Sequence, residues 1–139
     1  MIIGIFTDTF YPEVNGVATS CLNLYQELQR RGHTVHVYAP KCKGWEEFQS
    51  DTVHYLESKQ FILLKDRKVA LPGMGTIRQA LEMHFDVVHT NSEFIVGFLG
   101  TYIARHTGCI RIHTYHTVWE DYTYYITHGI GDNTAKNFV

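Results

Sequence analysis

Residues 1–40, MIIGIFTDTFYPEVNGVATSCLNLYQELQRRGHTVHVYAP, contain the pattern that decides the fold. The run from Ile2 to Thr7 is short and almost entirely apolar, which is typical of a strand buried on both faces of a parallel sheet. Apolar residues then recur every three or four positions between Val17 and Leu28, which predicts a helix with one buried face. Val35 to Ala39 is a second buried strand, closed by Pro40. The stretch therefore predicts a βαβ unit with a right-handed crossover.

The ends of this helix carry the expected signals. Asn15 can cap its N-terminus through its side chain. Gly32 is expected to end the helix, and Arg30 and Arg31 place cations at the negative end of its dipole.

The alternation of strands and helices continues along the rest of the chain. It is weaker between residues 41 and 84 and clear again from residue 86. Further strands are expected at 53–56, 86–90 and 110–114, a short apolar run at 61–64, and helices at 77–84 and 93–106. This pattern predicts an α/β fold, a Rossmann-like open parallel sheet with helices on both faces.

Composition narrows the class of protein. The chain has 139 residues with 45% hydrophobic and 19% charged side chains, enough apolar material for one folded domain and too little charge for a disordered one. The net charge of −2 disfavours a nucleic-acid-binding protein. Cys21, Cys42 and Cys109 form no paired pattern, which favours a reducing compartment. Without a leader peptide or a spanning segment, we expect a cytoplasmic protein, with attachment to a membrane surface left open.

In open parallel sheets, ligands bind outside the carboxyl ends of the strands. That rule selects three polar segments, Thr7 to Gly16, His89 to Glu93 and His113 to Asp121. Each places hydroxyl, amide, imidazole or carboxylate groups where a predicted strand ends. We therefore expect the functional site at this edge of the sheet.

The first of these segments lacks the glycine pattern of a dinucleotide site. It contains a single glycine, Gly16, in place of GxGxxG, which disfavours NAD or FAD as a ligand. Gly16 does stand at the start of a predicted helix, where free backbone N–H groups can meet a phosphate or a sugar hydroxyl. A tight turn that needs no side chain is the alternative explanation of this glycine.

Nine histidines invite a metal hypothesis, but their spacing does not support one. No HExxH pattern and no Cys/His cluster is present, so no metal site is predicted. His89 and His116 stand out because they fall at strand ends beside Glu93 and Asp121. His116 can donate to a sugar hydroxyl or stabilise developing charge, although a histidine that tethers a loop is an alternative. Six further histidines are expected at the surface or its boundary: His33, His36, His54, His84, His106 and His128.

A basic and apolar patch lies between Lys59 and Arg78. Lys65, Arg67 and Lys68 follow a short apolar run in an otherwise slightly acidic protein. This pattern is compatible with contact to anionic lipid. A solvated loop beside a buried strand explains it equally well.

Ordered motifs cover nearly the whole chain. They are GIFTDTFYP at 4–12, VNGVATS at 14–20, LQRRGHTVHV at 28–37, HTNSEF at 89–94, HTYHT at 113–117 and EDY at 120–122. Together they resemble the N-terminal domain of family 4 glycosyltransferases of the GT-B fold, and within that family the bacterial diacylglycerol glucosyltransferases. The resemblance implies retaining transfer of a hexose, usually glucose, from a nucleotide-sugar such as UDP-glucose to a lipid or other hydroxyl acceptor.

The resemblance also implies roles for individual residues. His116 is similar to the family's histidine at the sugar-transfer centre. Gly16, with Asn15 beside it, is similar to the glycine that lets the first loop approach the donor phosphate and sugar. The acidic residues Asp8, Glu93 and Asp121 lie in matching motifs and are expected to bind substrate. Such enzymes need neither a catalytic metal nor a cofactor.

The family's fold has two domains, and residues 1–139 resemble only the first, which mostly holds the acceptor. The donor-binding second domain is absent from the chain. We therefore expect the isolated chain to be inactive, and the full-length enzyme to use a nucleotide-sugar and a lipid acceptor at the inner face of the cell membrane. The alternative from another class is a non-catalytic binding or scaffold module that assists a partner chain.

Overall fold

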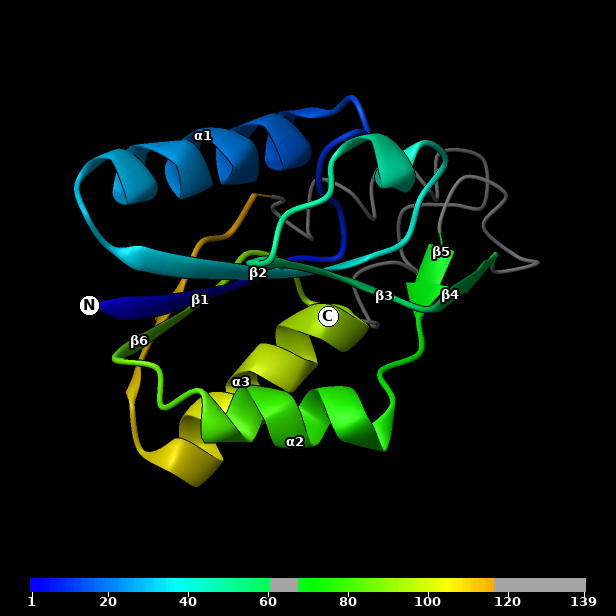
Figure 1. Cartoon of the computed structure of the whole chain (residues 1–139). Helices are drawn as coiled ribbons and strands as arrows, with labels where there is room; N and C mark the ends of the chain where they lie inside the picture. Colours follow the sequence, from blue (N-terminus) through cyan, green and yellow to red (C-terminus); the bar gives the residue numbers. More distant parts are fainter. Residues whose placement is uncertain (61–67, 117–139) are drawn as a thin grey trace, which may run out of the picture.

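The computed structural model describes residues 1–60 and 68–116, and these form three layers. One helix covers one face of a parallel sheet, and two helices cover the other (Figure 1). The sheet strands are β1 Ile2–Phe6, β2 Thr34–Pro40, β3 Val53–Leu56, β6 Val87–Thr90 and β7 Ile110–His113, and the helices are α1 Gly16–Arg30, α2 Met74–Glu82 and α3 Ile95–Thr107. Between β2 and α2 lie a short 3-10 helix at Trp45–Glu47 and the strands β4 Ser58–Gln60 and β5 Lys68–Ala70.

The five-stranded sheet has the order β3-β2-β1-β6-β7, and every pair in it is parallel. This confirms the predicted Rossmann-like α/β class. Strand β1 lies at the centre, where Ile5 pairs with Val37 of β2 on one side and His89 of β6 on the other. The chain leaves β1 toward β2 and later returns to the opposite side of β1, so the strand order reverses between β1 and β6. In this class of sheet, the reversal point is where ligands bind.

The predicted elements are confirmed with small shifts of their ends. Asn15 caps α1 as expected, its Oδ1 accepting a hydrogen bond from the Ala18 N–H at 2.8 Å. Helix α2 begins at Met74, earlier than expected, and α3 begins at Ile95, later than expected. Gly108, with a φ of 69°, ends α3. The antiparallel pair β4 and β5 was not predicted, and the apolar run at 61–64 lies outside the described residues. No described helix has the length and apolarity needed to cross a membrane.

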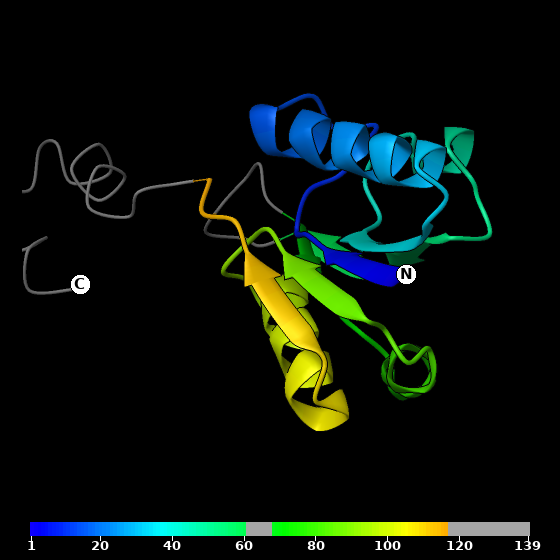
Figure 2. The same cartoon turned by 90° about the vertical axis from the view of Figure 1, so that its left-hand side faces the viewer.

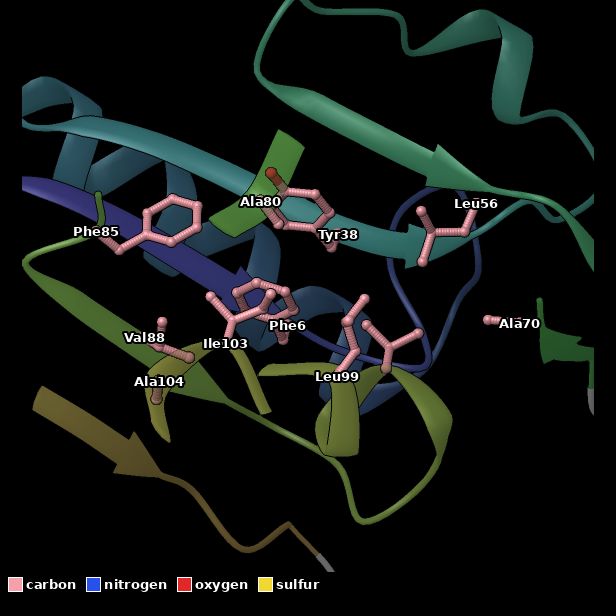
Figure 3. Close-up of a cluster of buried hydrophobic side chains, with 11 residues drawn as sticks. Phe6, Tyr38, Leu56, Ala70, Ala80, Phe85, Val88, Leu99, Ile103 and Ala104 are labelled. Carbon is pink, nitrogen blue, oxygen red and sulfur yellow. The ribbon is translucent and has the colours of Figure 1, made fainter. Parts of the chain in front are cut away.

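The larger core lies between the sheet and the helices α2 and α3 (Figure 3). Phe6 of β1 stacks on Tyr38 of β2 with ring centroids 4.7 Å apart, and Phe85 meets Phe6 edge-on at 6.1 Å. Ile103 and Leu99 extend this cluster from α3. Fully burying one such large side chain is worth about 2–3 kcal/mol, so this cluster holds α3 to the sheet.

A second core lies between the sheet and α1. Cys21 and Tyr25 of α1 pack against Ile5 and Val37, and Phe10 from the loop after β1 closes the cluster. The periodic apolar face read from the helix sequence is thus the face that α1 buries. Because Phe10 is itself buried, this core also holds the loop that leads from β1 to α1.

The prediction that His36 lies at the surface or its boundary is wrong. Its side chain is buried in β2, where Nδ1 lies 2.9 Å from Nε2 of His54 and the two rings stack at 5.2 Å. Tyr38 stacks on the same His54 ring at 4.6 Å. An imidazole is flat and largely apolar on its faces, so it packs in an aromatic layer that the sequence pattern alone does not reveal. His54 is half-buried, at the boundary, as expected.

Two glycines let α3 lie close to the sheet. A Cβ atom at Gly100 would lie 2.7 Å from Cγ2 of Thr90 and 2.8 Å from Cβ of Phe6, and one at Gly97 would lie 1.8 Å from the Ser92 carbonyl oxygen. All three distances are shorter than real Cβ contacts. The two glycines therefore allow close packing, and they set how near α3 lies to the sheet and to the loop after β6.

Candidate functional site

Polar residues from the carboxyl ends of β1, β6 and β7 meet at one edge of the sheet. Backbone hydrogen bonds connect the three strand ends. The Asn91 N–H donates to the Phe6 carbonyl at 2.9 Å, and the Thr114 N–H donates to the Thr90 carbonyl at 3.0 Å. The N-terminus of α1 and the end of β7 point to the same side of the molecule (Figure 2). The edge chosen from the sequence is therefore the edge at which these polar groups gather.

Asp8, directly after β1, binds the N-terminus of α3. Its Oδ1 accepts a hydrogen bond from the Val96 N–H at 3.0 Å, and its Oδ2 accepts one from the Gly97 N–H at 3.3 Å and one from the Ser92 hydroxyl at 2.5 Å. A carboxylate is favourable there because the helix dipole is positive at its N-terminus. Asp8 thus links the two strands between which the strand order reverses. That it also binds substrate stays a prediction.

Glu93, in the loop after β6, pairs with His113 at the end of β7. The Glu93 Oε1 atom lies 3.1 Å from His113 Nε2, and both side chains are largely buried. His113 Nδ1 lies 2.7 Å from the hydroxyl of Thr90, which is fully buried. In the neutral imidazole, Nε2–H donates to the carboxylate and Nδ1 accepts from the hydroxyl, so one ring satisfies both partners. Glu93 is thereby held at the edge of the sheet.

His116 is fixed by an amide that the sequence analysis did not select. Its Nε2 atom lies 3.1 Å from Oδ1 of Asn91, whose side chain is buried. Asn91 follows β6 directly, so the strand sets its position, and His116 stands three residues after the end of β7. The signal for Asn91 was present in the sequence, because it stands in the polar segment selected after this strand. An amide side chain in such a segment is therefore as good a candidate site residue as a charged one.

His89 joins the same set of groups from within β6. Its Nε2 atom lies 2.7 Å from the Thr114 hydroxyl. Burial lowers the pKa of His89, and the neighbouring His116 and His113 lower it further. Three imidazoles thus lie close enough to repel one another when protonated, which favours a neutral His89 at this edge.

The loop between β1 and α1 is tied together by Asn15. Its amide nitrogen donates to the Thr9 hydroxyl at 2.8 Å while its oxygen caps α1, and the Thr9 hydroxyl donates to the Glu13 carboxylate. Gly16, the first residue of α1, is exposed and has no described atom within 4 Å of the position of a Cβ. Its φ is not positive, so neither a left-handed turn nor packing among the described residues accounts for the glycine. What the missing side chain leaves is open access to the helix N-terminus.

Three of the predicted site residues, Asp121, Lys65 and Arg67, fall outside the part of the chain that the structure describes, and so does His128, which was predicted at the surface or its boundary. Lys68, at the start of β5, is exposed. Within residues 1–60 and 68–116, no group of three or more His, Cys, Asp or Glu side chains has the geometry of a metal site.

The edge thus combines groups of different chemistry. It has a helix N-terminus whose first residue, Gly16, is exposed, together with a carboxylate at Glu93 and an imidazole at His116. Such a set can bind hydroxyl and phosphate groups and can hold or accept a proton, which is the chemistry needed around a sugar phosphate. The structure brings Asp8, Glu93 and His116 to the ends of three neighbouring strands.

Comparisons with known proteins agree with this chemistry. The family model described as Glycosyltransferase Family 4 matches residues 14–139. The "Alpha-monoglucosyldiacylglycerol synthase" of Streptococcus pneumoniae (strain ATCC BAA-255 / R6) is 40% identical over 131 residues, which cover 94% of this chain and 30% of the relative. A protein of the same name from Acholeplasma laidlawii is 31% identical over 131 residues, covering 91% of this chain and 32% of the relative.

More distant relatives carry a different sugar in their names. The "GDP-mannose-dependent alpha-mannosyltransferase" of Mycobacterium tuberculosis (strain CDC 1551 / Oshkosh) is 28% identical over 120 residues, covering 83% of this chain and 32% of the relative. The chain therefore spans about a third of the length of these relatives.

Proposed function

The chain belongs to glycosyltransferase family 4, and we propose that it is the acceptor-side, N-terminal domain of a glycosyltransferase that moves a hexose from a nucleotide-sugar to a lipid hydroxyl. The donor nucleotide is bound by a second domain in the full-length protein. In this proposal residues 1–139 are a single Rossmann-like unit, of which the structure describes residues 1–60 and 68–116.

One observation carries the proposal. Glu93, Asn91 and His116 meet at the carboxyl edge of the sheet, beside the point where the strand order reverses between β1 and β6. An open parallel sheet binds its ligand there, and the groups present are suited to hydroxyl recognition. The family membership supports the reaction class, and this placement supports the proposed site.

The names of the relatives support the stereochemistry. Both the glucosyl-lipid synthases and the mannosyltransferases are named for alpha products or alpha transfer. A glucose linked to UDP is itself alpha-linked, so an alpha product means that the configuration at the anomeric carbon is retained. We infer glucose as the donor sugar because the relatives that share 40% and 31% identity are glucosyl-lipid synthases by name.

In this proposal the edge residues have separate tasks. The N–H groups at Gly16 bind the donor phosphate or sugar, because no side chain of the described residues lies within 4 Å of the position of a Cβ there. His116 contacts the sugar at the transfer centre. Asp8 holds α3 in place, and Glu93 and Asp121 bind hydroxyl groups of the substrates. Neither a metal ion nor an organic cofactor takes part.

An enzyme whose acceptor is a lipid has to act at a membrane surface. Lys68 is exposed at the start of β5, and in the sequence it directly follows Arg67 and stands three residues after Lys65. A cluster of cations attracts anionic lipid with about 1 kcal/mol for each Lys or Arg near the surface. We therefore propose that these three residues contact the inner face of the cell membrane and that the protein is peripheral to it.

The test compares the 139-residue chain with the longer protein that continues after Val139. Each is incubated with diacylglycerol vesicles and radiolabelled UDP-glucose, with GDP-mannose as the parallel donor. We expect transfer of glucose by the longer protein and none by the 139-residue chain, which lacks the donor domain. Robust turnover by the short chain would overturn the division of tasks, and no transfer from either donor by the longer protein would overturn the reaction.

A comparison of the two proteins also distinguishes the enzyme hypothesis from the hypothesis of a scaffold module. A stop codon directly after Val139 and a partner chain that is active only in its presence are the results expected of a module. An uninterrupted second domain with its own transfer activity is the result expected of the enzyme. A titration with NAD tests whether the chain is a generic dinucleotide-binding domain, and we expect no binding.

A further inference from the structure

His116 has one ring nitrogen engaged and one open. Nε2 lies 3.1 Å from Asn91 Oδ1, and no described residue hydrogen-bonds to Nδ1. The side chain of Asn91 is buried, with 4% of its surface exposed, while His116 is half-buried. Asn91 therefore belongs to the protein interior and His116 to its boundary with solvent.

The orientation of the Asn91 amide follows from its second contact. Its Nδ2 lies 3.4 Å from the backbone carbonyl oxygen of His89, which can only accept a hydrogen bond. The NH₂ group must face that carbonyl, so the amide oxygen faces His116. An amide oxygen is also only an acceptor, and the proton between Asn91 and His116 therefore belongs to Nε2 of His116.

A neutral imidazole carries one proton, and its two nitrogens have opposite roles. With the proton on Nε2, the Nδ1 atom has a free lone pair. Neutral His116 then accepts a hydrogen bond at Nδ1 from a ligand hydroxyl, where the sequence alone suggested that it donates one.

On this basis we propose that Asn91 is a positioning residue, which holds neutral His116 with its proton on Nε2 and leaves Nδ1 to accept a hydrogen bond from a substrate hydroxyl. The part about the substrate rests on the proposed function, whereas the position of the proton does not. Asn91 acts through His116 and needs no contact with substrate.

Two further imidazoles lie close to this pair. His89 lies in β6, two residues before Asn91, and its pKa is lowered by burial and by His116 and His113. A second positive charge beside these rings is therefore unfavourable. The carboxylate of Glu93 is engaged by His113 at 3.1 Å. Asn91 thus offers His116 an acceptor without the negative charge that would favour imidazolium.

The proton position can be read directly in the 139-residue chain. Nitrogen-15 spectra of histidine-labelled protein, recorded at a pH where imidazoles are neutral, distinguish a protonated from an unprotonated ring nitrogen. We expect His116 to show a protonated Nε2, an unprotonated Nδ1 and an Hε2 proton that exchanges slowly with water. A protonated Nδ1 in the wild-type chain would overturn the proposal without any variant.

Two variants test the role of Asn91. Asn91→Ala removes the acceptor, and we expect the slow Hε2 signal to be lost and the His116 tautomers to approach the mixture shown by exposed His84. Asn91→Asp keeps an acceptor oxygen of the same shape, so the Hε2 signal should persist. Thr114→Val, which removes the partner of His89, is the matched control and should leave His116 unchanged. Amide spectra show whether each variant is folded, and a His116 signal identical in Asn91→Ala and wild type would contradict the proposal.

The catalytic consequence is measured in the longer protein. We expect Asn91→Ala to lower kcat by roughly 10–100-fold, as losses of groups that orient a functional histidine do, with partial rescue by Asn91→Asp. The same change in a His116→Ala background should have no further effect, because the two residues act as a unit. Additive losses would contradict positioning. If wild type transfers no sugar, the proposed function fails while the spectra still decide the proton position.

Discussion

The carboxylate of Asp8 accepts a hydrogen bond from the backbone N–H of Val96 at 3.0 Å, which joins the end of the central strand to the first turn of α3. Asp8 thereby supplies the side-chain cap that Phe94, at the cap position of α3, cannot supply. The positive end of the α3 dipole is occupied by a group of the protein itself. Helix α1 has its own cap in Asn15, and the position of a Cβ at its first residue, the exposed Gly16, has no contact within 4 Å among the described residues.

Replacing Asp8 should therefore lower stability. We expect Asp8→Ala to reduce the free energy of unfolding by about 1–3 kcal/mol, because two helix N–H groups and the Ser92 hydroxyl lose their acceptor. Asp8→Asn should cost less, since one amide oxygen remains. Urea unfolding of both variants checks this, with Asp51→Asn in an exposed turn as the control. Equal stability of wild type and Asp8→Ala would show that the cap contributes nothing.

The close approach of α3 to the loop after β6 depends on Gly97. An added methyl group would lie 1.8 Å from the Ser92 carbonyl oxygen, so Gly97→Ala forces the helix and the loop apart. We expect a loss of about 1–3 kcal/mol or more. Gly75→Ala in α2 is the matched control, because nothing lies within 4 Å of its Cβ position. That change should be neutral or stabilising by up to about 1 kcal/mol. The melting temperatures of the two variants test this expectation, and similar shifts from wild type in both variants would contradict it.

The stacked pair of His36 and His54 should make stability depend on pH. Burial, and then the charge of His36, lowers the pKa of His54 to about 4 from 6.5, and burial lowers the pKa of His36 as well. As the pH falls from about 6.5 toward 4, the unfolded chain binds protons that the folded chain does not, so the free energy of unfolding decreases. We expect His54→Gln to show a shallower decrease than wild type in urea unfolding across this range. Parallel profiles would exclude His54 as a source of the pH dependence.

His116 should be required for transfer in the longer protein. We expect His116→Ala to lower kcat/KM by about 10²-fold or more, in the range found when a positioned imidazole is removed. His106→Ala, on the exposed side of α3, serves as the control and should retain activity. Unchanged turnover of His116→Ala would remove this residue from the transfer centre.

Membrane attachment should depend on the basic residues beside β5. We expect the chain to sediment with vesicles that contain anionic lipid and to remain in solution with neutral vesicles. Neutralising Lys65, Arg67 and Lys68 together should reduce that binding several-fold, and added salt should do the same. Lys43→Gln, an exposed lysine beyond β2, is the single-charge control. Binding that ignores both lipid charge and the triple variant would identify the patch as a solvated loop.

Much of the fold was predictable because the signals are local. A buried strand at residues 2–7 needs only a run of apolar side chains, and α1 needs only its periodic face and the Asn15 cap. The family motifs, too, stand in continuous segments. The Rossmann-like class, the glycosyltransferase family and the edge of the sheet that carries the site all follow from such segments.

The pairings within the site were not predictable, because each joins residues far apart in the chain. Nothing local assigns Asp8 to the N-terminus of α3, or Asn91 to the ring of His116, since strand order and register bring them together. The burial of His36 was missed for the same reason, as its aromatic neighbours come from other elements.

The sequence by itself therefore determined which groups are present at the carboxyl edge of the sheet. Through the family motifs it also indicated the reaction class. Only the tertiary structure decided which of them hold the fold and which remain open. A carboxylate such as Asp8 has the same chemistry wherever it stands, and its hydrogen-bond partners decide its task. Asp8 is occupied by α3, whereas His116 retains a nitrogen with no partner among the described residues, and that difference arises from packing alone.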